Sequence, residues 1–490
     1  MQSPKRWLIL AIVSSALLLI VIDMTVLYTA LPRLTHDLAA SASAKLWIVN
    51  AYALVVSGLL LGAGTLGDKL GPKRLFVWGL IVFGIASLCA AYSPTAGFLI
   101  AARVLLAVGA AMMMPSTLSI IRHTFTDERE RSLAIGIWAA VASGGAAFGP
   151  VVGGVLLEYF WWGSVFLINV PIVVIALSFA IPIIPERRIA TTQRWDWVGS
   201  LQIMVGLIGI AYAIKEVGKR VPSYEGAIFA LLIGALFMTI FVRRQKRDPE
   251  PLLDFSIFRI RGFTPALASA LIAAAALIGM ELIFTQRLQL VLGMTPLQAG
   301  LFILPLPLAS FVVGPLTGWF LQRVGNERML WIALTVSGLG MGAYLVFHNA
   351  PVWVQIICLA VLGAGIGATM TAASSTILHV APPDKTGMAA SIEEVSYELG
   401  GAIGVTLMGS IHAAVYTAAL VVPTGIKVSD TVRDSLDEAL VAAESLPADV
   451  GATLVTLSRS AFDHAFVVVL AAATVMLLVT ALLVLRSSRR

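Results

Sequence analysis

The sequence is poor in charged residues and contains almost no cysteine. Only 12% of its 490 residues are charged and 59% are hydrophobic, whereas soluble domains carry about 25% charged residues. This balance excludes an ordinary soluble enzyme, because a globular core cannot bury so much apolar surface. The two cysteines, Cys89 and Cys358, lie inside apolar runs and cannot form a disulfide framework.

Several motifs that carry chemistry are also missing. The chain has no GxxxxGK[ST] loop, which would cradle the phosphates of ATP. It has no HExxH pair for a metal and no GxSxG nucleophile turn. Its basic residues do not form an aromatic-interleaved face for nucleic acid. We therefore expect no enzymatic activity, no cofactor or metal, and no nucleic-acid partner. A non-transporting membrane sensor is a remote alternative.

Long apolar runs fill most of the chain. A bilayer core about 30 Å thick requires roughly 20 apolar residues per spanning helix, and fourteen runs meet that length. This pattern predicts an all-α membrane protein embedded in lipid. The runs are 7–31, 46–66, 75–93, 97–118, 132–157, 163–184, 197–216, 225–242, 263–289, 297–320, 329–347, 352–377, 388–414 and 462–485.

The basic residues predict the orientation of these helices. Most of the 33 lysines and arginines fall in loops on the side that carries both termini, and short basic loops stay cytoplasmic. Both termini are therefore expected inside. The longest loop on the other side, at about 417–460, is acidic. We interpret it as a solvated surface loop, with a cation-attracting vestibule as the alternative.

The two halves of the sequence resemble each other weakly. The run GGAAFG at 144–149 in the fifth predicted helix has a counterpart, GGAIG at 400–404, in the thirteenth. Internal repeats of this kind are common in secondary transporters, whose substrate sites lie between the repeats. We expect a six-helix bundle in 1–185, two inserted helices with a cytoplasmic connector in 186–262, and a second six-helix bundle in 263–490.

Five carboxylates fall within predicted helices: Asp23, Glu281, Glu393, Glu394 and Glu398. Ionisable groups are costly in hydrocarbon, so each is a candidate functional residue. Glu394 and Glu398 share one helix face, and Glu398 falls near the membrane midplane. With Tyr397 beside them, these acids suit an organic cation. Glu393 is an additional candidate, unless it faces water at the cytoplasmic mouth, and Glu281 is a weaker one.

The paired acids also suggest coupling to protons. Two close carboxylates cannot both ionise cheaply in an empty site, so one should hold a proton that an arriving cation displaces. Aromatic side chains are expected to wall the same apolar cavity, although each alone is more often a packing residue. These are Tyr28, Tyr52, Trp138 and Phe148, together with Tyr397.

Two glycine-rich motifs resemble those of the major facilitator superfamily. GTLGDKLGPKRL at 64–75 is similar to the loop between its second and third helices, and it matches at Gly64, Gly67, Asp68, Gly71, Lys73 and Arg74. GGAAFGPVVGG at 144–154 is similar to the fifth-helix pattern of its antiporters, with Gly145, Gly149, Pro150, Gly153 and Gly154 in place. The resemblance implies rocking halves and export. A plain basic loop and generic glycine packing are the alternatives.

Further segments narrow the resemblance to the fourteen-helix DHA2 drug:proton antiporters. IDMTVLYTALP around Asp23 resembles their first helix, and LIAARVLLAVGAA around Arg103 resembles the fourth-helix arginine motif. At 1.5 Å per residue, these two side chains lie at similar depth. We hypothesise that Arg103 holds the Asp23 carboxylate ionised in one state and releases it in another. A fixed pair that only stabilises the bundle is the alternative.

IEEVSYELGG and WGSVFLINVP look most like the QacA and SmvA group of quaternary-ammonium and methyl-viologen exporters. This resemblance implies export of lipophilic cations, including antiseptics and dyes, in exchange for protons across a bacterial inner membrane. The proton gradient would supply the energy, and we expect a monomer. A fourteen-helix transporter of another substrate class, such as tetracycline–metal complexes or peptides, is the alternative.

Overall fold

The computed structural model describes residues 3–186, 196–218, 221–249, 251–382, 386–423 and 428–488. Within these ranges the chain is helical and contains no strand. The helices are α1 Ser3–Asp37, α2 Ala42–Leu70, α3 Pro72–Ala91, α4 Ala96–Thr124, α5 Glu128–Tyr159, α6 Ser164–Leu167, α7 Asn169–Ile183, α8 Trp197–Val217, α9 Tyr224–Gln245, α10 Phe263–Gln286, α11 Pro296–Ile303, α12 Pro305–Val324, α13 Asn326–Phe347, α14 Val352–Val380, α15 Thr386–Ala419, α16 Leu436–Glu444 and α17 Ala448–Ser488. Three short turns of helix, at Phe255–Arg259, Arg287–Val291 and Asp430–Arg433, connect them.

The helix lengths fit a membrane protein. In the described part of the chain, thirteen helical segments are long and apolar enough to cross a bilayer. They coincide with thirteen of the predicted runs, and the remaining run, 132–157, lies in α5. The prediction of an all-α membrane protein is therefore confirmed. The exact number of crossings and the side on which the termini lie stay predictions.

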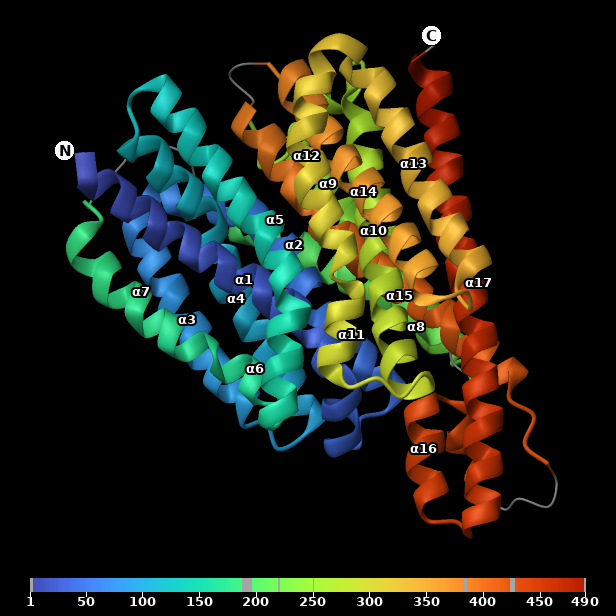
Figure 1. Ribbon diagram of the computed structural model, residues 1–490. Helices are drawn as coiled ribbons and strands as arrows, with labels where there is room; N and C mark the ends of the chain where they lie inside the picture. Colours follow the sequence, from blue (N-terminus) through green and yellow to red (C-terminus); the bar gives the residue numbers. More distant parts are fainter. Residues whose placement is uncertain are drawn as a thin grey trace.

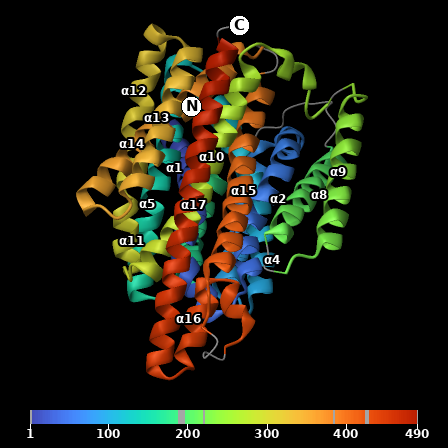
Figure 2. The ribbon, with the colours of Figure 1, turned by 90° about the vertical axis from the view of Figure 1, so that its right-hand side faces the viewer.

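The helices form two lobes with a helix pair beside them (Figures 1 and 2). Helices α1 to α7 pack on one another in one lobe, and α10 to α15 pack with α17 in the other. The pair α8 and α9 packs on itself, and α8 contacts α2 and α15. Both termini lie toward the same end of the molecule (Figure 1). The predicted domain limits at residues 185 and 262 stay predictions.

The two lobes share the same type of turn between two consecutive helices. Gly71 joins α2 to α3 with φ 93° and ψ 134°, and Gly325 joins α12 to α13 with φ 84° and ψ 147°. Only glycine adopts a positive φ of this kind without strain. The glycines at these two turns therefore share one backbone conformation.

Close helix packing is repeated as well. In the first lobe, glycines of α5 lie against α1, and in the second, Gly400 and Gly404 of α15 lie against α10. A Cβ at Gly404 would come within 2.1 Å of the Ala275 carbonyl oxygen. Missing side chains thus allow the helices in each pair to approach backbone to backbone.

Candidate coupling and cation-binding site

Asp23 and Arg103 form a fully buried ion pair in the first lobe. The Nη1 of Arg103 on α4 donates a hydrogen bond of 2.7 Å to Oδ2 of Asp23 on α1. Asp23 is 0% exposed and Arg103 is 2% exposed. The two side chains, which helix rise puts at similar depth, are therefore in direct contact.

Neighbouring groups satisfy the arginine. Its Nε donates to the Ile48 carbonyl oxygen at 3.2 Å, and its guanidinium carbon lies 4.6 Å from the centre of the Tyr52 ring. Charges removed from water must be compensated by hydrogen bonds and by an opposite charge. The pair is therefore held by α2 as well as by α1 and α4.

Sequence reasoning missed Asn169 at the start of α7. Its Nδ2 donates to Oδ1 of Asp23 at 2.8 Å and lies 3.2 Å from the Ser87 hydroxyl on α3. The available signal was a single amide inside the apolar run 163–184, because a polar group in hydrocarbon requires a partner. Asp23 thus accepts hydrogen bonds at both oxygens.

Glu398 on α15 is buried without comparable compensation. The residue is 7% exposed, and among the described residues its Oε2 has no hydrogen-bond partner. It interacts electrostatically with Glu394 in its own lobe and with Arg103 across the lobe boundary. Tyr28 and Tyr52 of the first lobe also lie within electrostatic reach of Glu398. Charged groups of both lobes therefore face one central region.

Glu393 lies in the protein interior and does not face open water. It is 6% exposed, and the Tyr397 hydroxyl, one helical turn further on, donates to its Oε1 at 2.7 Å. The Ser374 hydroxyl on α14 donates to it as well. The hydrogen bond from Tyr397 therefore positions the Glu393 carboxylate. Tyr397 also lies within electrostatic reach of Glu394.

Glu281 on α10 does not pair with Arg287. The arginine instead donates to Asp463 of α17 at 2.7 Å and to Asn349 at 2.9 Å. Six residues of separation place the two side chains on different faces of a helix. Glu281 lies within electrostatic reach of Tyr28 and therefore belongs to the same central region.

The predicted aromatic residues occupy different settings. Tyr28 is 8% exposed, and Tyr52 is 1% exposed with a hydroxyl that has no hydrogen-bond partner in the described chain. The Trp138 Nε1 donates to Thr117 of α4 at 3.1 Å. Phe148 is 59% exposed. Of these four, Tyr28 and Tyr52 lie within electrostatic reach of Glu398.

The loop motif at 64–75 is held by contacts within the first lobe. Lys73 donates to the Ile181 carbonyl oxygen of α7 at 2.7 Å, and Arg74 pairs with Glu186. A Cβ at Gly67 would lie 3.3 Å from the Leu75 side chain. Nothing is described of Gly64 beyond its backbone or of the Asp68 side chain, so the part that these two residues play in the motif stays a prediction.

The fifth-helix motif faces two neighbours. Gly145, Gly149 and Gly153 lie against α1, where an added Cβ at Gly149 would meet the Thr25 side chain. Gly154 lies against the backbone of α11 in the other lobe, and the Pro150 carbonyl oxygen would be 2.4 Å from a Cβ at Gly300. The motif therefore joins α1 to α5 within one lobe and brings the two lobes together.

Other contacts between the lobes lie at the end away from the termini. Lys45 near the start of α2 pairs with Asp437 of α16 and donates to Gln286 of α10 at 2.9 Å. The Asn50 amide donates to Thr406 at 2.6 Å. Asp437 is 9% exposed, so the start of α16 is docked on the first lobe, whereas Asp430, Glu444 and Asp449 of the same acidic segment are exposed.

Two helical lobes that enclose buried charges define a multi-pass membrane transporter. A model of the Major Facilitator Superfamily matches residues 13–405. The chain therefore belongs to this superfamily, whose members are transporters and not enzymes. The expected family is confirmed.

Relatives and solved structures agree with this assignment. The chain is 38% identical over 480 residues to the methyl viologen resistance protein SmvA of Salmonella typhimurium, and the aligned region covers 97% of each chain. It is 38% identical over 466 residues to the multidrug efflux pump LfrA of Mycolicibacterium smegmatis, and this alignment covers 94% of this chain and 92% of that protein. An inward-facing, unoccupied crystal structure of a bacterial homologue of the human lysosomal transporter Spinster shares the fold, with a TM-score of 0.65 and 18% identity over 99% of both chains.

Proposed function

We propose that this protein exports lipophilic organic cations in exchange for protons by alternating access. The observation that carries the proposal is Glu398, a buried carboxylate beside a second acid, Glu394, with one oxygen that has no hydrogen-bond partner among the residues that the structure describes. A buried anion requires a proton or a cation to neutralise it. The names of the relatives SmvA and LfrA, with methyl viologen resistance and multidrug efflux, support this substrate class.

The two lobes divide the work in this proposal. A cation that enters between them displaces a proton from the Glu394 and Glu398 pair. Tyr28 and Tyr52 offer aromatic faces on the opposite side of the central region, which favour organic cations. Asp23 is ionised while Arg103 contacts it, and it accepts a proton when movement of the lobes separates the pair.

The proposal includes the setting of the protein. The chain lies in a bacterial inner membrane with both termini cytoplasmic, acts as a monomer, and uses the proton gradient without a cofactor. Residues 1–185 and 263–490 form the moving bundles, and 186–262 supply the inserted helices. The contacts of Lys45 and Gly154 at the far end support a state that is closed on the external side.

Proton release on cation binding tests the function directly. Methyl viologen or ethidium is added to the purified protein in weakly buffered detergent, and the released protons are recorded with a pH dye. We expect release from the wild type and its loss in Glu398→Gln, because a glutamine amide does not ionise and so has no proton to release. Transport into proteoliposomes with an imposed pH gradient gives the second readout.

Glu225→Gln is the matched control, because Glu225 is an exposed acid at the start of α9. It should release protons like the wild type. Unchanged release in Glu398→Gln removes that residue from the coupling site. Absence of any cation-dependent release, with uptake of tetracycline–magnesium or peptides instead, replaces the proposed substrate class.

A further inference from the structure

A cavity lies away from the central region, at the end of the bundle opposite the termini. It has a volume of about 210 Å³ and is formed where α2, α8 and α15 meet the segment that follows α15. Pockets that hold drug-sized molecules measure roughly 300–1,000 Å³. This cavity therefore suits a small group and is too small for a whole drug.

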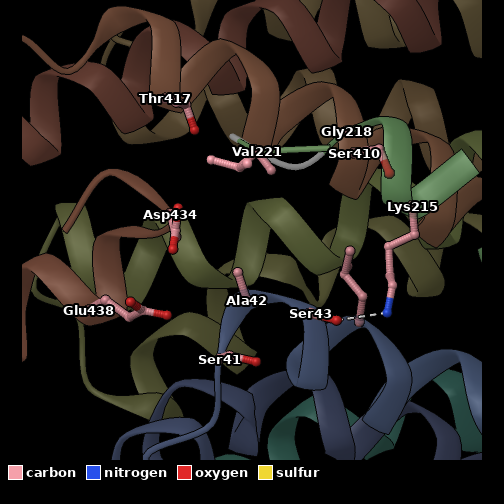
Figure 3. Close-up of a pocket in the computed structure, with 12 residues that line it drawn as sticks. Ser41, Ala42, Ser43, Lys215, Gly218, Val221, Ser410, Thr417, Asp434 and Glu438 are labelled. Carbon is pink, nitrogen blue, oxygen red and sulfur yellow. Dashed lines mark hydrogen bonds between the residues drawn. The ribbon is translucent and has the colours of Figure 1, made fainter. Parts of the chain in front are cut away.

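The lining carries opposite charges on opposite sides. Figure 3 shows Lys215 and Ser410 on one side, and Asp434 and Glu438 on the other. Lys215 is held in place, because its Nζ donates to the Ser43 hydroxyl at 2.7 Å and lies 4.5 Å from the centre of the Trp47 ring. A ligand with one charge would be repelled at one side, so the lining favours a zwitterion.

Two further features of the lining suit a polar ligand. Ser410 lines the cavity and is 7% exposed, and its buried hydroxyl has no hydrogen-bond partner in the described chain. On the acidic side, the pKa of Glu438 is raised, mainly because the carboxyl group is partly buried and secondly because the negative charge of Asp434 is near. A hydrogen bond from the Ala42 backbone N–H and the positive charge of Lys45 act to lower it. A ligand that accepts a hydrogen bond from the Ser410 hydroxyl, beside Lys215, and places a cation at the Glu438 carboxylate would satisfy both groups.

The surroundings place the cavity at a lipid–water boundary. It lies at the first turn of α2 and just beyond the last turn of α8, and Trp47 and Tyr212 flank Lys215. Tryptophan and tyrosine gather at membrane interfaces. Val221 at the rim is 71% exposed, which is favourable against acyl chains and unfavourable in water.

We propose that this cavity binds the head group of a phospholipid that carries a phosphate and a primary ammonium group, such as phosphatidylethanolamine. The phosphate lies toward Lys215 and Ser410, and the ammonium donates to Asp434 and Glu438. The acyl chains remain in the bilayer beside the α8 and α9 pair. This site is separate from the proposed transport of cations.

Lipid retention measured by native mass spectrometry tests the proposal. The full-length protein is exchanged into detergent with equal amounts of phosphatidylethanolamine, phosphatidylglycerol and phosphatidylcholine. We expect preferential retention of phosphatidylethanolamine, with progressive loss across its N-methylated derivatives, because each methyl group removes an N–H donor. Equal retention of all three lipids overturns the proposal, and this comparison needs no protein variant.

Variants assign the charges. Glu438→Gln and Asp434→Asn should each weaken retention of phosphatidylethanolamine roughly tenfold, as expected for loss of one charge-assisted hydrogen bond. Glu444→Gln is the control, because Glu444 is an acid on the same helix whose side chain is 70% exposed. Equal loss in the control, or no loss in the two cavity variants, contradicts the assignment.

A soluble head group distinguishes a lipid from a free metabolite. Glycerophosphoethanolamine carries the same charges without acyl chains and should compete only weakly. If it binds as tightly as the lipid, the site recognises a water-borne molecule and the lipid assignment is wrong. Because binding is measured without transport, failure here leaves the export proposal intact, and failure of export leaves this site intact.

Discussion

Gly154 of α5 faces the backbone of α11 across the boundary between the lobes. A Cβ at this position would lie 2.5 Å from the Leu297 Cα and 3.0 Å from the Pro296 carbonyl oxygen. These neighbours are backbone atoms, so they cannot rotate away as a side chain does. In Gly154→Ala, helices α5 and α11 must therefore separate.

The required movement can be estimated. Ordinary contact begins at 3.4 Å, so the helices must part by about 0.9 Å at Leu297. Overpacking of this kind costs about 1–3 kcal/mol, and it is paid only in the state that brings the lobes together here. The equilibrium should therefore shift about 5- to 150-fold toward the state that is open at this end.

Spin-label distances measure the shift. Labels on cysteines at Asp37 and Leu292, which are both exposed at this end on different lobes, are placed in a chain whose Cys89 and Cys358 are replaced by alanine. The distance distribution should gain a longer component in Gly154→Ala.

Gly97→Ala is the control for this measurement. A Cβ at Gly97 in the first turn of α4 would meet nothing within 4 Å, so its distances should match those of the parent chain. An unchanged distribution in Gly154→Ala would refute the argument that this close contact sets the balance between the two states.

Three further predictions concern the charged residues Lys45, Glu438 and Asp23. Lys45→Ala should lower the free energy of unfolding by about 3–5 kcal/mol, because Asp437 is left buried and uncompensated, and apolar replacement of both residues should restore most of it; additive losses in melting experiments would contradict this. The raised pKa of Glu438, caused first by burial and then by nearby Asp434, means that its contribution to stability is complete below its ordinary value of 4.5 and is lost as pH rises through the raised pKa. In lipid-free detergent, Glu438→Gln should therefore match the wild type in melting temperature at about pH 4 and exceed it at pH 7, and an equal difference at both pH values would count against this. Asp23→Asn should abolish the pH dependence of methyl viologen export in vesicles, and a normal pH profile in that variant would exclude Asp23 as a proton carrier.

Part of the site could be predicted from the sequence. Asp23 and Arg103 stand out as charges in apolar runs, and helix rise alone gives them similar depth. The acids of α15 stand out in the same way. The sequence could not show that Asn169 completes the pair, because the partner of an amide depends on which helices are neighbours.

Other contacts were beyond sequence reasoning for a similar reason. Lys45 and Asp437 are separated by 392 positions, and neither has a local pattern that names the other. The cavity at Lys215 and Glu438 combines residues of α2, α8, α15 and the following segment. Its opposite charges become one lining only after those elements pack.

The sequence by itself determined the membrane environment, the helical class and the family, because these depend on local hydrophobicity, helix length and short motifs. Tertiary structure decided which buried charges are compensated. Asp23 is hydrogen-bonded to an arginine and an amide, whereas one oxygen of Glu398 has no partner within the described part of the chain. Electrostatic energy in a low-dielectric interior depends on distances of a few ångströms between groups far apart in the chain, and only the packed lobes fix those distances.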